Sequence, residues 1–153
     1  METLATVKAE KNISIVQQAY ADFAKGNISG IANACTDDVV WGTYDNPAIP
    51  YGKKFQGKKG VGEFFAGLAE TIDYSDFQPR QFFSDGDYVF VKGYHAATVK
   101  GTGKSFGHDF LMEFKLHDGK FTSFFAYIDT REQAEAFKKS LSQKKFFLQR
   151  HDL

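Results

Sequence analysis

The chain has little that would mark an extracellular, metal-binding or nucleic-acid-binding protein. It holds one cysteine, Cys35, which excludes a disulfide framework within the chain. Its 19 basic and 19 acidic residues balance, so no net charge would hold it on nucleic acid or an acidic membrane. The four histidines lack close metal-ligand spacing, and the first six residues lack an apolar secretion segment. We therefore expect a cytoplasmic protein without metal, cofactor, nucleic-acid partner or membrane partner.

Motifs of several enzyme classes are also missing. Segment 57–62 is rich in glycine, but it lacks the preceding buried strand and the spacing of a nucleotide-binding loop, so we interpret it as a turn that enters a helix. No Gly-x-Ser-x-Gly sequence supports serine hydrolysis. Cys35 lies in an apolar, helix-like stretch without a nearby histidine, which favours a buried structural thiol over a nucleophile.

Aromatic residues are abundant, with 17 Phe, 7 Tyr and 1 Trp among 153 residues. This aromatic volume suits a large, flat-walled cavity or a buried subunit interface, with a bulky core as the alternative. The length and the 42% hydrophobic content indicate one domain over residues 1–153. Residues 142–153 are assigned to a C-terminal tail, and the basic run over 138–145 reads as a solvated helical face.

Helical periodicity recurs along the chain. Apolar residues three and four apart predict a first helix that stops at 26–27, a short second helix over 29–35, and a third that lasts from about 61 to 73. Residues 45–58 contain turn and proline signals and predict an irregular segment over the sheet. The sequence 130–133 fits a capping box, which predicts a terminal helix directly after Asp129.

Strand patterns fill the remainder. A β-like run covers 37–41, and alternation from 75 to 129 is broken by turn sequences at 84–87, 101–103 and 117–120. The alternating region therefore predicts four consecutive antiparallel strands. Together with the helices, these strands predict an α+β fold.

The turn at 118–119 allows a prediction of strand register. If it is a two-residue loop, His117 pairs with Lys120, and His108 then faces Asp129. The same register pairs Phe110 with Tyr127 and Met112 with Phe125 on one face, although a single β-bulge would break it. The opposite face of the last strand, which includes Phe124, is too apolar for water and predicts cover by a second subunit in a homodimer.

His108 and Asp129 are the candidate catalytic residues. A carboxylate opposite an imidazole orients the ring, and apolar walls raise the pKa of an unpaired acid. The alternative, in which Asp129 only caps the following helix, stays open. Asp45 is a second candidate carboxylate or an Asx-turn residue, and His95 is interpreted as a core histidine opposite Phe110. The candidate ligand-binding residues are Tyr20, Trp41, Tyr44, Asp45, Phe55, His95, Phe110, Phe125 and Tyr127.

Six short segments keep a characteristic order and spacing: 37–41, 49–57, 61–65, 102–104, 118–121 and 127–130. Over about residues 10–140 the chain resembles the SnoaL-like, ketosteroid-isomerase-related branch of the nuclear transport factor 2-like superfamily. The resemblance implies a cone-shaped barrel of a strongly curved antiparallel sheet, with three to four helices over its concave face. It also implies a pocket between helices and sheet, and a homodimer through the outer sheet face.

The resemblance further implies a role for Asp129, because cyclase-like members use an Asp in the barrel as general base. The base of ketosteroid isomerase falls where this chain has Thr43, so steroid isomerisation is not implied.

Two functions follow as hypotheses. In the first, the chain is a cofactor-independent enzyme, an isomerase/cyclase-like lyase or hydrolase, that transfers a proton on a small apolar or aromatic carbonyl compound. Asp129 would be the base, and His108 would orient it or donate the second proton. In the second, it is a non-catalytic ligand-binding or dimerising module. A donor near Asp129, such as Tyr20, Tyr44 or Tyr127, would favour the enzyme. An Asp129 tied to backbone amides would favour the binder.

Overall fold

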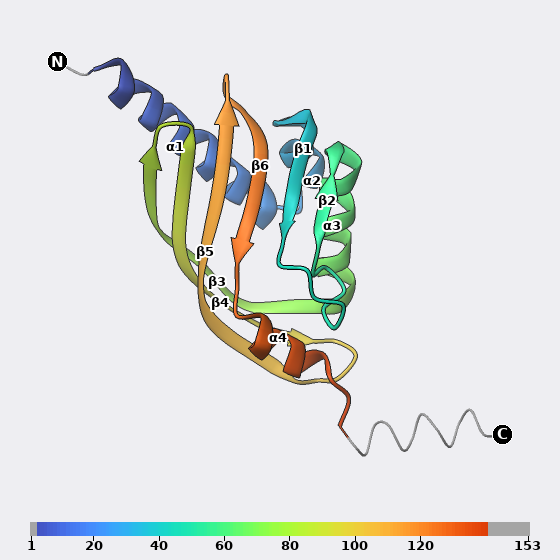
Figure 1. Cartoon of the computed structure of the whole chain (residues 1–153). Helices are drawn as coiled ribbons and strands as arrows, with labels where there is room; N and C mark the ends of the chain where they lie inside the picture. Colours follow the sequence, from blue (N-terminus) through green and yellow to red (C-terminus); the bar gives the residue numbers. More distant parts are fainter. Residues whose placement is uncertain (1–2, 141–153) are drawn as a thin grey trace.

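A computed structural model describes residues 3–140, which form a six-stranded sheet with helices packed on it (Figure 1). The helices are α1 (Leu4–Ala24), α2 (Ile28–Asn33), α3 (Gly57–Thr71) and α4 (Thr130–Phe137). The strands are β1 (Cys35–Thr43), β2 (Lys54–Gln56), β3 (Ile72–Asp85), β4 (Tyr88–Val99), β5 (Ser105–His117) and β6 (Lys120–Tyr127). The strand order β2-β1-β6-β5-β4-β3 confirms the predicted α+β class. The predicted tail 142–153 and the end of the basic run lie outside the described residues.

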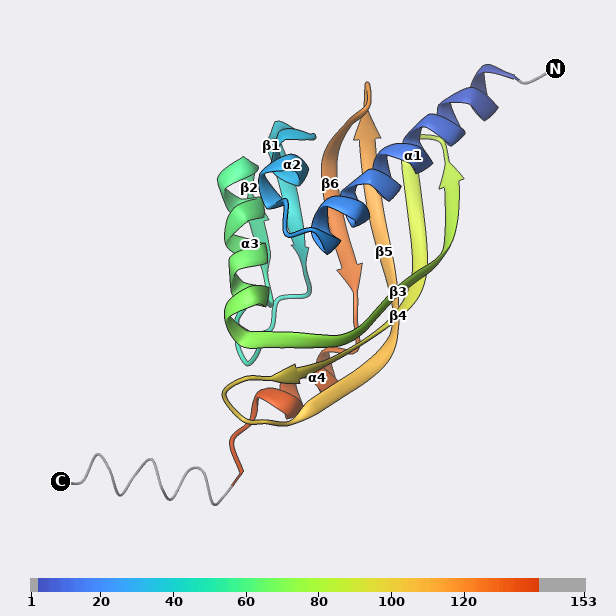
Figure 2. The same ribbon diagram turned by 180° about the vertical axis from the view of Figure 1, so that it is seen from behind.

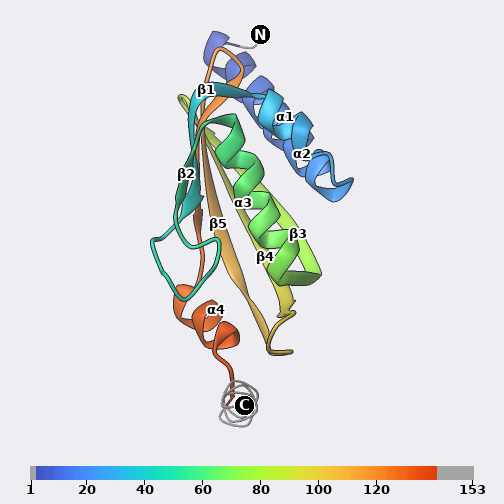
Figure 3. The ribbon, with the colours of Figure 1, turned by 90° about the vertical axis from the view of Figure 1, so that its right-hand side faces the viewer.

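The sheet curls along its length without closing. Figure 2 shows β3, β4 and β5 bending beneath the helices, and Figure 3 shows α1, α2 and α3 on one face of the sheet with α4 at one end. Register shifts in the β3–β4 pair between Tyr74 and Asp76 and between Pro79 and Gln81 contribute to this bend, because bulges increase the local curvature of a strand. The cone-like shape and the four helices agree with the predicted fold. The sheet is mixed, because β1 and β6 pair in parallel while the other strand pairs are antiparallel as predicted. Within residues 3–140, no helix combines the length and apolar character needed to cross a membrane.

The helix boundaries follow from caps and glycines. The Thr3 side chain accepts a hydrogen bond from the Thr6 N–H at the start of α1, and Gly26, with φ 73°, follows its end. Gly57, with φ 76°, opens α3, so segment 57–62 is part of the helix itself and the helix starts about four residues before the predicted start at 61. The second and third helices end at residues 33 and 71, two residues before the predicted ends.

Cys35 is the first residue of β1. The prediction that it belongs to a helix was therefore wrong. Its side chain is buried, and the thiol donates to the Ile31 carbonyl oxygen at 3.3 Å. Burial raises the pKa of the Cys35 thiol to about 12, so the thiolate is scarce at neutral pH. The predicted assignment as a buried structural thiol agrees with this environment.

The irregular segment after β1 is shorter than predicted, because β2 and the first turn of α3 occupy residues 54–58. Asn46, not Asp45, forms the turn: its Oδ1 accepts from the Ala48 N–H at 3.0 Å. The segment then turns inward and buries Ile49 and Tyr51 in the core.

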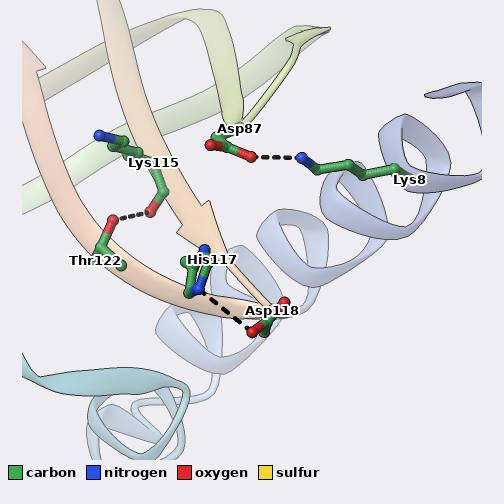
Figure 4. A network of polar contacts seen from close by, with 6 residues as sticks. All are labelled: Lys8, Asp87, Lys115, His117, Asp118 and Thr122. Atoms are coloured by element: carbon green, nitrogen blue, oxygen red, sulfur yellow. Dashed lines mark hydrogen bonds and ion pairs between the residues drawn. The ribbon is translucent and has the colours of Figure 1, made fainter.

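The β5–β6 hairpin begins in the predicted register and leaves it after two pairs. Leu116 pairs with Phe121 as expected, but Thr122 is an extra residue and Lys115 pairs with Ser123. Figure 4 shows the Thr122 hydroxyl donating to the Lys115 carbonyl oxygen, at 3.2 Å. Because a bulge moves the register by one residue, each later residue of β6 faces the side opposite to the predicted one.

This shift exchanges the two faces of β6. Met112 pairs with Ala126 instead of Phe125, and Tyr127 pairs with Leu111 instead of Phe110. Phe124 points inward and is 6% exposed, so its predicted place in a dimer interface is wrong. The outward-facing residues Phe125 and Tyr127 join Tyr44 in a group of three rings, the outer aromatic cluster.

Exposed ion pairs lie at the turns of the β3–β4 and β5–β6 hairpins. Lys8 forms an ion pair with Asp87, and the hydrogen bond and charge of Lys8 lower the pKa of Asp87 (Figure 4). Asp118 lies 3.3 Å from the ring of His117 in the next hairpin. These solvent-exposed pairs add little stability.

Candidate functional site

Helices α1 and α3 and the concave face of the sheet enclose a cavity. Its volume, measured by the positions that the centre of a water molecule can take, is about 60 Å³. Ten of its nineteen lining residues are Phe, Tyr or Trp, and none of the nineteen is Asp, Glu, Lys or Arg. The lining residues are Ala19, Tyr20, Phe23, Ile31, Trp41, Thr43, Tyr51, Phe64, Phe65, Leu68, Tyr74, Phe77, His95, Met112, Phe114, Phe124, Ala126, Ile128 and Gln133.

The aromatic walls come from strands that present flat rings on the concave face. Trp41 of β1 stacks on Phe124 of the neighbouring β6, with ring centres 4.4 Å apart and planes at 22°. Phe114 of β5 and Phe64 of α3 contact the same Phe124 ring from other sides. Such walls bind planar apolar groups through a large contact area.

Three buried nitrogen atoms in this wall have no hydrogen-bond partner among the described residues. They are Nδ1 and Nε2 of His95 and Nε1 of Trp41. Burial, together with the neighbouring His108, lowers the pKa of His95 to about 3, so its ring is neutral at neutral pH. Leaving a buried donor or acceptor unpaired costs about 1–3 kcal/mol. Unpaired groups beside a cavity indicate a site that a bound molecule can complete.

Four other polar side chains of the wall are paired. The Tyr20 hydroxyl donates to Met112 Sδ at 3.0 Å, and the Thr43 hydroxyl donates to the Ala126 carbonyl oxygen at 2.6 Å. The Tyr51 hydroxyl donates to Gln133 Oε1, which is buried beside it. Burial raises the pKa of Tyr20 and of Tyr51, so both remain protonated donors.

Asp129 and His108 do not face one another, because of the bulge at Thr122. His108 instead pairs across β5 and β4 with His95, with ring centres 4.7 Å apart. Asp129 is exposed and caps α4, where its carboxylate accepts from the Glu132 N–H at 3.0 Å. The alternative interpretation of Asp129 as a cap is therefore confirmed, and the cap residue is Asp129, one residue before the predicted capping box.

The other predicted ligand-binding residues divide into three groups. Tyr20, Trp41 and His95 line the cavity. Phe55 and Phe110 are buried outside the lining, Phe55 against Phe64 and Phe110 against His95. Asp45 is exposed, and the outer aromatic cluster lies on the convex face of the sheet, so these positions were predicted wrongly as parts of the pocket. His95 lies opposite His108, not Phe110, and its nitrogens are unsatisfied.

Sequence reasoning missed Tyr51 and Gln133. In the sequence, Tyr51 was interpreted only as part of a turn signal. Gln133 lies on the buried face of α4 together with Ala136. A glutamine on the apolar face of an amphipathic helix is a signal that could have found the second residue. Within residues 3–140, no group of three or more His, Cys, Asp or Glu side chains could hold a metal ion.

The sequence model of the SnoaL-like domain matches residues 16–124 of this chain. The chain belongs to the SnoaL-like family. No curated protein matches the SnoaL-like chain.

Solved structures extend the likeness of this SnoaL-like protein. A protein of the nuclear transport factor 2-like class from Burkholderia xenovorans LB400 superposes with a TM-score of 0.77 at 24% identity, over 85% of this chain and 98% of that one. TerC, co-crystallized with polyporic acid, superposes with a TM-score of 0.74 at 28% identity, over 83% of this chain and 98% of TerC. A protein with a ketosteroid isomerase-like fold from Catenulispora acidiphila DSM 44928, in complex with trimethylamine, superposes with a TM-score of 0.68 at 14% identity. The match covers 82% of this chain and 93% of that one.

Proposed function

We propose that this SnoaL-like protein binds a small aromatic compound that carries a carbonyl or hydroxyl oxygen. The observation that carries the proposal is the combination of flat aromatic walls with the unpaired nitrogens of His95 and Trp41. Aromatic walls favour a planar, apolar ligand, whereas unpaired buried groups favour a ligand that completes their hydrogen bonds.

The chemistry of these nitrogens narrows the ligand class. The indole Nε1–H of Trp41 only donates and therefore requires an acceptor. The neutral His95 ring donates from one nitrogen and accepts at the other. Because no lining residue supplies a counter-charge, a charged ligand would lose its hydration without gaining an ion pair. A neutral aromatic ketone or phenol satisfies these conditions.

The relative TerC supports an aromatic ligand class, because it was co-crystallized with polyporic acid, an aryl-substituted quinone. The carbonyl oxygens of a quinone are acceptors of the kind that the Trp41 N–H requires. The position of Asp129 also favours binding over catalysis, since its carboxylate accepts from a backbone amide at a helix start.

The test compares two ligands with one carbon skeleton, the bicyclic aromatic ketone 1-tetralone and its hydrocarbon counterpart tetralin. Isothermal titration calorimetry should show saturable binding of both, with 1-tetralone about tenfold tighter because its oxygen pairs a buried donor. His95→Phe should reduce this preference, and Phe125→Ala on the outer face should leave it unchanged. No saturable binding of either compound to the wild-type protein would refute the proposal.

A second candidate function is proton transfer next to a carbonyl group, as in an isomerase- or cyclase-like enzyme. One observation favours it: a neutral imidazole, His95, lies in the same wall as the hydroxyl group of Tyr74. Its unprotonated nitrogen can accept the α-proton while the Tyr74 hydroxyl donates to the enolate oxygen that forms. The wild-type protein would then accelerate the exchange of the α-hydrogens of 1-tetralone in D₂O, measured by proton NMR. If the wild-type protein binds 1-tetralone but exchanges its α-hydrogens no faster than His95→Phe does, the enzyme function is refuted and only the binding function stands.

A further inference from the structure

A series of hydrogen bonds leads from the cavity to His108 on β5. The Tyr51 hydroxyl contacts Gln133 Oε1, and Gln133 Nε2 lies 3.0 Å from Nε2 of His108. The other ring nitrogen of His108, Nδ1, lies 2.9 Å from the Asp109 carbonyl oxygen. Tyr51 and Gln133 are 3% and 1% exposed and both line the cavity, whereas His108 is only partly buried.

The direction of every bond in this chain follows from its outer end. The carbonyl oxygen of Asp109 only accepts, so Nδ1 of His108 carries the hydrogen. In the neutral ring Nε2 is then an acceptor, and it faces the amide NH₂ group of Gln133. Oε1 of Gln133 is left for Tyr51, whose hydroxyl therefore donates away from the cavity to the amide.

A second proton on His108 reverses the inner half of the chain. The new Nε2–H would face the NH₂ group of Gln133, and two donors cannot pair. Rotating the amide by half a turn removes the conflict: Oε1 accepts from His108, and NH₂ donates to the Tyr51 oxygen. The hydroxyl hydrogen of Tyr51 has then lost its acceptor and is available to a ligand in the cavity.

We propose that His108 and Gln133 are positioning residues that determine whether Tyr51 donates a hydrogen bond into the cavity. The inference rests on the proposed function only for its effect on ligand affinity, because the hydrogen bonds belong to the free protein. An acceptor ligand such as 1-tetralone should bind more tightly when His108 is protonated, whereas tetralin, which has no acceptor, should not respond.

The titratable groups that face His108 come from β4, α4 and β5. From β4 comes His95, which stays neutral above about pH 3. From α4 come Gln133 and Glu132, and the Glu132 carboxylate accepts from the Gly107 N–H at 2.9 Å. On β5 itself, the side chain of Asp109 alternates to the opposite face of the strand. The protonation of the His108 ring itself is therefore what the first test below follows directly.

The first test needs no ligand. In isotope-labelled protein, NMR should show hydrogen on Nδ1 of His108 at pH 8, and the side-chain amide signals of Gln133 should change with the same midpoint as His108 as the pH falls. A neutral ring with hydrogen on Nε2, a His108 that takes up no proton by pH 5, or Gln133 signals that ignore the protonation of His108 would overturn the proposal.

The second test measures affinity by calorimetry at pH 8 and pH 5. The wild-type protein should bind 1-tetralone about two- to tenfold tighter at pH 5, the range that one hydrogen bond contributes. Tyr51→Phe should lose the difference but keep binding. Gln133→Glu should also lose it, because a carboxylate has no hydrogen to donate and accepts from the Tyr51 hydroxyl whether or not His108 is protonated. A pH effect that survives in both variants, or that tetralin shares, would refute the coupling.

The two tests separate the proposals. If neither compound binds at any pH, the proposed function fails, and the NMR titration still decides whether the chain of hydrogen bonds reverses. If 1-tetralone binds without a pH effect, the ligand class holds and the positioning role of His108 and Gln133 fails.

Discussion

Phe124 and Phe125 are neighbours on β6 in opposite environments, so truncating each in turn tests the β-bulge that separates them from the hairpin. Phe124 is 6% exposed, stacks on Trp41 at 4.4 Å and lies 4.9 Å from Phe114 between ring centres. Phe125 is only partly buried on the convex face, beside Tyr44 at 5.0 Å. A continuous two-residue hairpin would place these two side chains the other way round.

The structure gives the expected magnitudes. Removing a buried Phe side chain typically costs about 3–5 kcal/mol, and Phe124 should fall near 3 kcal/mol because part of its surface already faces a cavity. Phe125→Ala loses two exposed aromatic contacts, with Tyr44 and Tyr127, and a cation–π contact with Lys54 at 5.7 Å, and it should cost about 1 kcal/mol. The difference should therefore be about 2 kcal/mol.

Urea denaturation followed by circular dichroism measures both values, with the linear dependence of the unfolding free energy on urea concentration extrapolated to water. Because a dimer would make the stability depend on concentration, each variant should be measured over a series of protein concentrations. Equal losses, or a larger loss for Phe125→Ala than for Phe124→Ala, would refute the bulge and the inward position of Phe124.

Three further predictions follow. Asp129→Ala should lower the unfolding free energy by about 1 kcal/mol through loss of the cap on Glu132, Asp129→Asn should restore most of it, and 1-tetralone affinity should not change in either variant. Tyr127→Asp should shift a homodimer toward monomer in light scattering, since it puts a charge into the outer aromatic cluster; an unchanged mass would place any interface elsewhere. His95 is protonated more easily in the unfolded chain, with a pKa of 6.5 against about 3 when folded, so stability should fall as the pH drops from 6.5 toward 3. The slope should exceed that of His95→Phe by at most about 1.4 kcal/mol per pH unit, and parallel curves would contradict the burial of a neutral ring.

The fold was largely predictable because its signals are local. Helical periodicity, a glycine with positive φ at 57 and three turn sequences lie within a few residues of the elements they define. The resemblance to a known family then supplied the curved sheet and the packing of helices on its concave face. The helices and turns, in contrast, depend on short-range patterns that one sequence carries in full.

The site was less predictable because it depends on a register that one residue alters. Thr122 fits the alternation of β6 as well as any other residue, yet its hydroxyl bonds to the Lys115 carbonyl oxygen and it pairs with no residue of β5. That single insertion turned Phe125 and Tyr127 outward and separated His108 from Asp129. Gln133 was missed for another reason: its partners, Tyr51 and His108, lie on a loop and a strand far away in the sequence.

Unpaired buried atoms alone do not identify a binding site in this protein. Asn12 Nδ2 and Ser84 Oγ are also buried without a partner, yet neither residue lines the cavity. What distinguishes His95 and Trp41 is that both residues line the cavity. Each unpaired group costs about 1–3 kcal/mol, a substantial share of the roughly 5–15 kcal/mol that stabilises a typical domain. A ligand that pairs these nitrogens removes that cost only in the folded state, so a bound ligand must also raise the free energy of unfolding.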